Sequence, residues 1–367
     1  MSRCRHGILA FVALVLLSCS APAGGGTSAS GGAPAQPAAQ PPAAGGGASA
    51  APAGSQAPAT PAAREPGKLA VTALALSISP AAIADEMGYW REEGIEPELP
   101  YIAGAAQPAQ ALVAGDVQFV AGAGATAVPA SLQGADLVVI AVSVPTYPFT
   151  IQSPRLQRLE QLRDGKLGVT RRGAASDFAA RYALQTVGLQ GDRDVPIIQM
   201  GGEPEAIAAM ESGAVDAAVV SEFGTVEARH RGYHELMDIG RAGAPYALTG
   251  LVTSRKLVAE RPDFVRRFVR GWVRGLAAAA TKPDISLPIM KRFIKADDDE
   301  RLREAYNIFT GYVARIPYPK PDGIQAVIDT LAQDEPRAAG FKAADFIDDR
   351  FIRELDESGF FKQLYGE

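Results

Sequence analysis

Cysteine is nearly absent from this chain. Its 367 residues contain two, Cys4 and Cys19, and both lie at the N-terminal end. The sequence after position 19 cannot form a disulfide, so the fold must rest on its own hydrophobic core. The 300 residues from 68 to 367 are enough, because a chain of that length buries about 75% of its unfolded surface, usually as two domains.

Histidine is also scarce, and beyond the first six residues it occurs only as His230 and His234. This pair has helical i, i+4 spacing, but Gly232 lies between them and no third ligand is close in sequence, so we expect no metal site. A Ser-His-Asp triad would have to use one of these histidines, and the chain has no G-x-S-x-G motif. We therefore predict no catalytic residue and no enzymatic activity.

A dinucleotide cofactor is not expected either. Gly122-x-Gly124-x-x-Ala127 follows an apolar segment and superficially matches a dinucleotide-binding fingerprint. That motif opens a βαβ unit and needs an acidic residue at the end of the next strand. Here the next predicted strand, 137–144, ends in Ser-Val, so we predict no cofactor.

Basic residues are outnumbered by acidic ones. Without residues 1–18, Lys and Arg fall from 36 to 34 against 41 Asp and Glu, a net charge of −7 with neutral histidine. This balance argues against nucleic acid as a partner and against a polybasic membrane-binding surface. Any membrane attachment must then come from a covalent lipid.

The first nineteen residues have the organisation of an export signal. Arg3 and Arg5 precede an eleven-residue apolar run, 7–17, which is too short to span a bilayer as a lasting helix. The sequence LLSC at 16–19 resembles the lipobox of bacterial lipoproteins. This resemblance implies a signal peptide at 1–18, a diacylated Cys19 and a lipid-anchored protein in the periplasm or an equivalent extracytoplasmic space. An ordinary secretory signal is the alternative.

Residues 20–66 consist almost wholly of Ala, Pro, Gly, Ser, Gln and Thr, with charge only at Arg64 and Glu65. No periodic apolar face is present, so we predict a disordered tether over 19–67. A chain of that length has an r.m.s. reach of roughly 35–40 Å, which lets a folded domain move just above a membrane. A stalk with a role of its own is the alternative.

A repeat with an offset of 98 residues runs through the middle of the chain. KLAVT at 68–72 recurs as KLGVT at 166–170, and ALVAGDV at 111–117 recurs as AMESGAV at 209–215. Each copy alternates short apolar strands with helices. This alternation predicts α/β layers with parallel strands and right-handed crossovers.

We predict an α/β protein of two lobes. The first lobe comprises 68–148 and 250–367, and the second comprises 149–249. The chain would cross between them twice, once at each boundary of the second lobe, and the two crossings would form a hinge. The sequence after 252 reads as amphipathic helices without strands, beginning with an apolar stripe in 262–282, and we expect these helices to cover the first lobe.

Four segments share a recognisable pattern: AIADEMGYWREEGI at 82–95, the opening of the second copy at 166–189, and the segments 208–217 and 351–360. Together they resemble the substrate-binding proteins of ABC transporters for sulfonates, taurine, nitrate and thiamine precursors. The resemblance spans 68–367. It implies a two-lobed periplasmic-binding-protein type II fold, the venus flytrap, with the C-terminal helices packed on the first lobe. It also implies a monomer that closes on a small solute and delivers it to a permease and its ATPase.

The resemblance leaves a second function open. It also covers a eukaryotic thiamine-pyrimidine synthase, whose cysteine-rich iron motif is absent here. An exported enzyme or a sensor-accessory protein that reuses the fold is therefore the alternative. A solute receptor should be stabilised by its solute and leave it chemically unchanged.

Candidate ligand-binding residues follow from the architecture, because in open α/β sheets solutes bind beyond the carboxyl ends of the strands. Polar, small or aromatic residues follow the predicted strands and accompany the crossovers: Ser77, Ser79, Gly124, Ala125, Thr126, Tyr147, Arg171, Arg172, Gly173, Ser176, Ser221, Glu222, Phe223, Tyr246 and Thr249.

On balance these residues favour a small organic anion. Glycine amides and the helix that begins near Ser176 attract negative charge, and Arg171 or Arg172 could bind a carboxylate or sulfonate. Glu222 argues the other way, because a carboxylate repels an anion and accepts from an amine or a ring N–H. Three aromatic residues could stack on a flat solute: Tyr147, Phe223 and Tyr246.

Overall fold

The computed structural model describes residues 63–122 and 124–366. The predicted signal peptide (1–18), Cys19 and the predicted tether up to residue 62 lie outside these residues. β1 (Glu65–Val71) begins inside the range predicted as tether. Glu65 joins the sheet because it pairs with Ile95 of the neighbouring strand, and its carboxylate forms an ion pair with Arg267.

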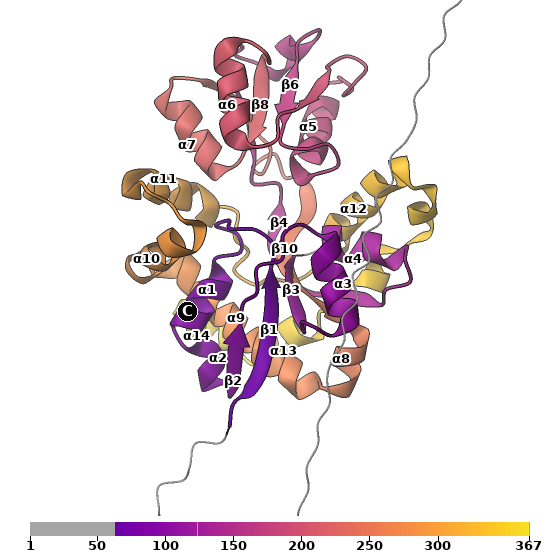
Figure 1. The fold of residues 1–367 in the computed structure, drawn as a ribbon, viewed down its shortest axis with the longest axis vertical. Coiled ribbons are helices and arrows are strands. Elements are labelled where there is room, and N and C mark those ends of the chain that lie inside the picture. Colours follow the sequence, from indigo (N-terminus) through magenta and orange to yellow (C-terminus); the bar gives the residue numbers. More distant parts are fainter. Residues whose placement is uncertain (1–62, 123, 367) are drawn as a thin grey trace, which may run out of the picture. The chain divides into compact units, whose positions relative to one another are not determined.

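Two five-stranded mixed sheets form the framework of the described part of the chain (Figure 1). The first has the order β2-β1-β3-β10-β4, with β2 (Ile95–Glu98), β3 (Phe119–Gly122), β4 (Leu137–Thr146) and β10 (Pro245–Ser254). The second has the order β7-β6-β8-β5-β9, with β5 (Thr150–Ser153), β6 (Leu167–Val169), β7 (Ile197–Gln199), β8 (Ala217–Val220) and β9 (His234–Asp238).

The two sheets repeat one unit, as the sequence predicts. Leu69 of β1 pairs with Phe119 of β3, and Leu167 of β6 pairs with Ala217 of β8, so both partners are displaced by 98 residues. The parallel neighbours β2 and β7 complete the same arrangement. β3, β6 and β8 are buried throughout, which matches their continuous apolar sequences.

The chain passes between the sheets twice. β4 ends in the first sheet at Thr146 and β5 begins in the second at Thr150, while β9 ends at Asp238 and β10 returns at Pro245. β10 is antiparallel to both β3 and β4. It pairs with β4 from Pro245 onward, so the first sheet takes in residues 245–249, which the sequence-based boundaries placed in the second lobe.

The helices pack around these sheets. They are α1 (Pro80–Glu86), α2 (Tyr89–Glu92), α3 (Ala106–Ala114), α4 (Gly124–Ser131), α5 (Ala175–Thr186), α6 (Glu203–Ser212), α7 (Glu222–His230), α8 (Arg255–Glu260), α9 (Pro262–Thr281), α10 (Pro283–Ile294), α11 (Asp299–Thr310), α12 (Pro321–Asp334), α13 (Arg350–Glu357) and α14 (Phe360–Tyr365). In the part of the chain that the structure describes, no helix combines the length and apolar character needed to cross a membrane.

The C-terminal helices cover the first sheet, as predicted. α9 buries its apolar stripe against α1 and α2, and Phe268 stacks on Phe119 with ring centroids 3.8 Å apart. α12 packs on β10 and α4, and α13 contacts β4. Adjacent residues of β1 belong to different core clusters, Leu69 to that of α9 and Ala70 to that of α12, so these helices lie on opposite faces of the sheet.

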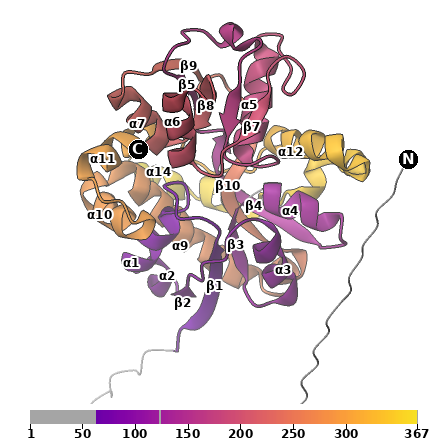
Figure 2. The same ribbon diagram turned by 45° about the horizontal axis from the view of Figure 1, so that its top comes forward.

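α11 extends this packing to the second half of the repeat. It contacts α7, as both views show (Figure 2). Arg301 forms an ion pair with Glu227, and Glu304 lies 2.8 Å from the His230 ring. α11 therefore connects the C-terminal helices to α7, a helix that packs on the second sheet. The sequence pattern did not indicate this contact.

The contact of α9 with α1 predicts an effect on stability. A Cβ atom at Gly275 would overlap the carbonyl oxygen of Pro80, so we expect Gly275→Ala to lower the free energy of unfolding by about 1–2 kcal/mol, despite the better helix propensity of alanine. Urea unfolding measures the change. Gly340→Ala is the matched control, because a Cβ there meets no atom within 4 Å. A Gly275→Ala protein as stable as the wild type would contradict this packing.

Candidate functional site

A cavity of about 920 Å³, here called the first cavity, lies between elements of the two sheets. One wall is the loop after β1, residues 72–78, and the opposite wall is one side of α6 and of α7, beginning with Glu203 and Glu222. Residues 294–301, between α10 and α11, form a third side. The cavity therefore lies beyond the carboxyl ends of β1 and β8, the kind of place where open α/β sheets bind ligands.

Glu222 is the most deeply placed charged residue of this cavity. It is the first residue of α7 and is only 8% exposed, yet it lines the cavity. Among the described residues, none other than Glu222 itself donates a hydrogen bond to its carboxyl group. Burial raises its pKa to about 8, and the neighbouring Glu203 contributes in the same direction. The group is thus largely protonated at neutral pH.

Glu203, the first residue of α6, is held in place by the residue before Glu222. The backbone N–H and the hydroxyl of Ser221 both donate to its carboxylate at 2.9 Å. Burial raises its pKa, while these hydrogen bonds act in the opposite direction. The Glu203 carboxylate is therefore held in one position by Ser221, and Glu222 is the carboxyl group available to a solute.

The rest of the first cavity is acidic at its rim and apolar inside. Two arginines of the described lining, Arg231 and Arg301, both form ion pairs with Glu227, and Arg231 also pairs with Glu211. Asp297 and Asp298 add negative charge beside them. The apolar contribution comes from these side chains: Leu74, Leu76, Ile78, Phe149, Ile207, Phe223, Leu248 and Ile294.

A second cavity of about 910 Å³ lies on the other side of residues 72–73. Its walls are α3, α4, the start of α5 and one side of α12. It shares Thr72, Ala73 and Leu248 with the first cavity, and no Asp, Glu, Lys, Arg or His occurs among its described lining residues. The two cavities therefore adjoin the same three residues and differ in chemical character.

Nine of the candidate residues line a cavity. Five line the first: Ser77, Ser221, Glu222, Phe223 and Thr249. Four line the second: Ala125, Thr126, Gly173 and Tyr246.

Four further candidates are engaged in packing or in local hydrogen bonds. Ser79 is buried and donates to the Leu76 carbonyl oxygen at 2.7 Å. Tyr147 is buried and stacks on Tyr246 with centroids 4.2 Å apart. The other two are Gly124, where a Cβ would press on Val327, and Ser176, whose hydroxyl lies 2.7 Å from that of Thr170.

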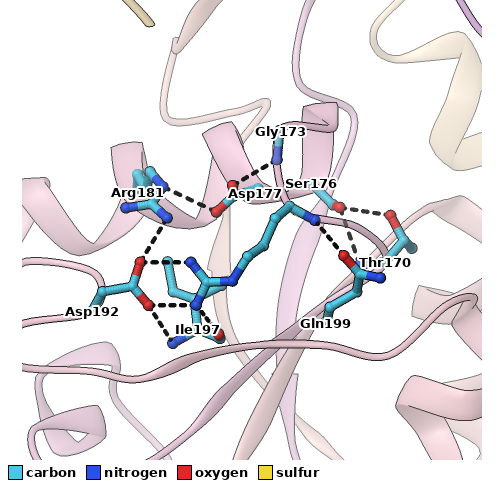
Figure 3. A network of polar contacts seen from close by, with 9 residues as sticks. Thr170, Gly173, Ser176, Asp177, Arg181, Asp192, Ile197 and Gln199 are labelled. Carbon is cyan, nitrogen blue, oxygen red and sulfur yellow. Dashed lines mark hydrogen bonds and ion pairs between the residues drawn. The ribbon is translucent and has the colours of Figure 1, made fainter. Parts of the chain in front are cut away.

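The two arginines do not face either cavity. The Arg172 guanidinium donates to both carboxylate oxygens of Asp192, at 2.9 and 2.7 Å, and to the Ile197 carbonyl oxygen at 2.7 Å. Figure 3 shows Asp192 held also by Arg181, and the Arg172 hydrogen bonds are the main cause of its lowered pKa. Arg171 is exposed and lines neither cavity. Of the two arginines proposed to bind an anion, Arg172 is thus occupied by a structural ion pair with Asp192 and Arg171 lies on the surface.

The sequence analysis missed Glu203 and most of the apolar lining. Glu203 follows β7, a strand of only three residues whose last residue is exposed, so its pattern is weak. The signal that could have found it is Gly201-Gly202-Glu203-Pro204, a glycine turn with proline in the first helical turn.

Comparison with known proteins agrees with this architecture. The family model described as NMT1/THI5 like matches residues 76–286, which is more than half of the chain. The chain belongs to the NMT1/THI5-like family.

Two relatives and one solved structure are similar to this chain. A Brucella abortus protein named only as a binding protein is 28% identical over 231 residues, 62% of this chain and 70% of its own. The riboflavin-binding protein RibY of Chloroflexus aurantiacus is 27% identical over 60% of this chain and 63% of its own. The periplasmic aliphatic sulphonate binding protein SsuA of Escherichia coli covers 77% of this chain and 92% of its own with a TM-score of 0.66 and 15% identity, and so shows the periplasmic-binding-protein fold.

The environment of Glu222 predicts a pH-dependent stability. Its ordinary pKa is 4.5 and its folded pKa is about 8, so between these values the folded protein holds a proton that the unfolded chain has released. The free energy of unfolding should therefore fall as pH rises through this range, by at most about 1.4 kcal/mol per pH unit. Glu222→Gln removes this contribution, so its stability relative to the wild type should increase with pH in urea titrations.

Glu205→Gln is the control, because Glu205 is exposed on the same helix as Glu203 and lines neither cavity. Its pH profile should follow that of the wild type. Parallel profiles for the wild type and Glu222→Gln would show that Glu222 is not buried as described.

Proposed function

We propose that this protein is the solute-binding component of an ABC-type importer and that it binds a small molecule in the first cavity. The observation that carries the proposal is the cavity itself, which is walled by residues beside both sheets and contains one buried carboxyl group that no other described residue hydrogen-bonds. Family membership and the periplasmic-binding-protein fold support it. A permease and its ATPase are the partners this function requires.

The proposed solute carries an N–H donor beside a hydrogen-bond acceptor, as in an amino-substituted nitrogen heterocycle. A protonated carboxyl group has one O–H donor and one carbonyl acceptor, so Glu222 can pair with both atoms of such an edge. Phe223 and Phe149 line the same cavity and provide flat apolar surfaces for a ring. The relative named for riboflavin, itself a nitrogen heterocycle, is consistent with this solute class.

The organic anion predicted from the sequence is disfavoured by the cavity lining. Both arginines of the first cavity already form ion pairs, and six carboxyl groups line it: Glu203, Glu211, Glu222, Glu227, Asp297 and Asp298. An anion there would lose hydration without gaining a free cationic partner.

Binding is proposed to act by population shift. Ser77, from the loop after β1, and Glu222, from α7, belong to opposite walls of the first cavity. A solute that contacts both walls at once favours the closed state by its difference in affinity for the two states. The solute is released unchanged, which distinguishes this function from that of an exported enzyme with the same fold.

Calorimetry with 2-aminopyrimidine, 2-aminopyridine, methanesulfonate, taurine and acetate tests the solute class. We expect binding of the two heterocycles, weakened about 10- to 100-fold by Glu222→Leu, because this variant loses both the donor and the acceptor of the carboxyl group and each hydrogen bond contributes about 0.5–1.5 kcal/mol. Glu205→Leu should bind as the wild type does. Binding of the sulfonates or acetate alone, or equal affinities of the wild type and Glu222→Leu, would reject this solute class.

We further propose attachment to a membrane through a lipid on Cys19. In a bacterial host fed labelled palmitate, the full chain should carry label and appear in the membrane fraction, because two acyl chains provide stable anchoring. Cys19→Ser should lose both, whereas Cys4→Ser should keep both, since Cys4 lies within the predicted signal peptide. Label retained by Cys19→Ser would refute the anchor.

A further inference from the structure

The second cavity is as large as the first but has a different chemical character. Its described lining has no charged side chain and includes ten alanines, while larger apolar surfaces come from Phe178, Tyr246, Leu248, Val327 and Leu331. Its two glutamines, Gln110 and Gln133, are exposed residues. Such a cavity removes carbon-rich surface from water but offers little to a charged group.

The two cavities are counterparts within the repeat. The first is built from the loop after β1 and one side each of α6 and α7, and the second from residues 173–175 after β6 and one side each of α3 and α4. The offset of 98 residues equates Glu203 with Ala105 and Glu222 with Gly124. The duplicated architecture therefore provides two similar spaces, and the acidic residues are present at only one of them.

The boundary between the cavities carries no charge. The residues common to both are Thr72, Ala73 and Leu248. The Thr72 hydroxyl already donates to the Ala121 carbonyl oxygen at 2.8 Å, so it offers no unsatisfied donor at this boundary. A molecule that contacts both cavities therefore meets no charged side chain among the residues that they share.

Exposed apolar side chains also point to an occupant. The large hydrophobic residues that are well exposed in the described chain are Leu74, Tyr101, Val113 and Ile285. Val113, at 60% exposure, lines the second cavity, and Leu74 lines the first. Apolar surface gathered at a concave site is characteristic of ligand binding.

We propose that the solute is bipartite: its N–H-bearing polar group faces Glu222 in the first cavity, and an apolar, carbon-rich part occupies the second cavity. This inference rests on the proposed function and specifies the class of solute, a nitrogen heterocycle with a sizeable hydrocarbon or aromatic substituent. Each cavity alone is already within the usual size of a small-molecule site, about 300–1,000 Å³. A compact polar solute would leave the second cavity unused.

The first arm of the test probes the second cavity directly with the neutral dye N-phenyl-1-naphthylamine. We expect its fluorescence to rise and saturate with the wild type. Ala106→Phe and Ala130→Phe add bulk from α3 and α4, on residues that line the cavity, and should weaken dye binding about tenfold or more. Gln107→Phe is the matched control, because Gln107 is the neighbouring exposed residue of α3 and lines neither cavity.

The second arm measures the link between the cavities with 2-aminopyrimidine and its 5-ethyl, 5-butyl and 5-hexyl derivatives. For the wild type, affinity should rise about fourfold per methylene that enters the second cavity. Ala106→Phe and Ala130→Phe should flatten this dependence and leave the affinity for 2-aminopyrimidine unchanged. Glu222→Leu, which removes the donor and the acceptor, should lower the affinity of the whole series by one factor without changing its slope.

The outcomes separate this inference from the proposed function. Suppose that 2-aminopyrimidine binds through Glu222 but the length of the alkyl substituent has no effect, or has the same effect in Ala106→Phe and Ala130→Phe as in the wild type. The bipartite solute is then refuted and the proposed function stands. If no member of the series binds, or if all members bind equally well to Glu222→Leu and to the wild type, the proposed solute class fails and the bipartite solute fails with it, even where the dye still binds. The inference is supported if affinity rises with the length of the alkyl substituent in the wild type and this rise is lost in both Ala106→Phe and Ala130→Phe.

Discussion

The insertion of β10 between β3 and β4 is the constraint on which the structure depends. β10 returns the chain from the second sheet to the first, and it can approach β4 closely only because residue 250 is glycine, since a Cβ there would overlap the Ala141 carbonyl oxygen. Just before this point the same strand places Leu248 in both cavities and Thr249 in the first. The Thr249 carbonyl oxygen accepts from buried Ser143 at 3.1 Å, and its hydroxyl donates to Ser77 at 3.2 Å. The strand that joins the halves therefore also lines both cavities.

The fold could be predicted from the sequence because its signals are periodic and repeated. An offset of 98 residues predicts equal strand pairings in both halves, and the pairs Leu69–Phe119 and Leu167–Ala217 have that relation. The direction of individual side chains could not be predicted in this way. Arg172 follows a strand end as a ligand-binding arginine would, but its partner Asp192 lies twenty residues further along the chain. Nothing in the local pattern distinguishes this ion pair from a free guanidinium.

The acidic character of the first cavity follows from two helix starts. Glu203 and Glu222 each occupy the first turn of a helix, where the helix dipole favours a negative charge. Burial opposes that preference and prevails at Glu222, whose pKa is raised. The backbone N–H groups that would otherwise attract an anionic solute thus lie beside the protein's own carboxyl groups. A fold shared with a sulphonate-binding protein therefore carries an acidic cavity in this chain.

In the proposed mechanism, closure depends on the buried carboxyl group rather than on the ion pairs between α11 and α7. The ion pairs of Arg301 with Glu227 and of Glu304 with His230 connect these helices, but all four side chains are partly exposed. Exposed pairs contribute about 0–1 kcal/mol each and are screened by salt, so they can hold α11 against α7 without fixing the position of one sheet relative to the other. A solute that pairs with Glu222 adds hydrogen bonds to a buried carboxyl group that no other described residue hydrogen-bonds, and this proposed gain is less sensitive to salt. Because the opposite wall of the cavity is the loop after β1, that gain is complete only when both halves enclose the solute.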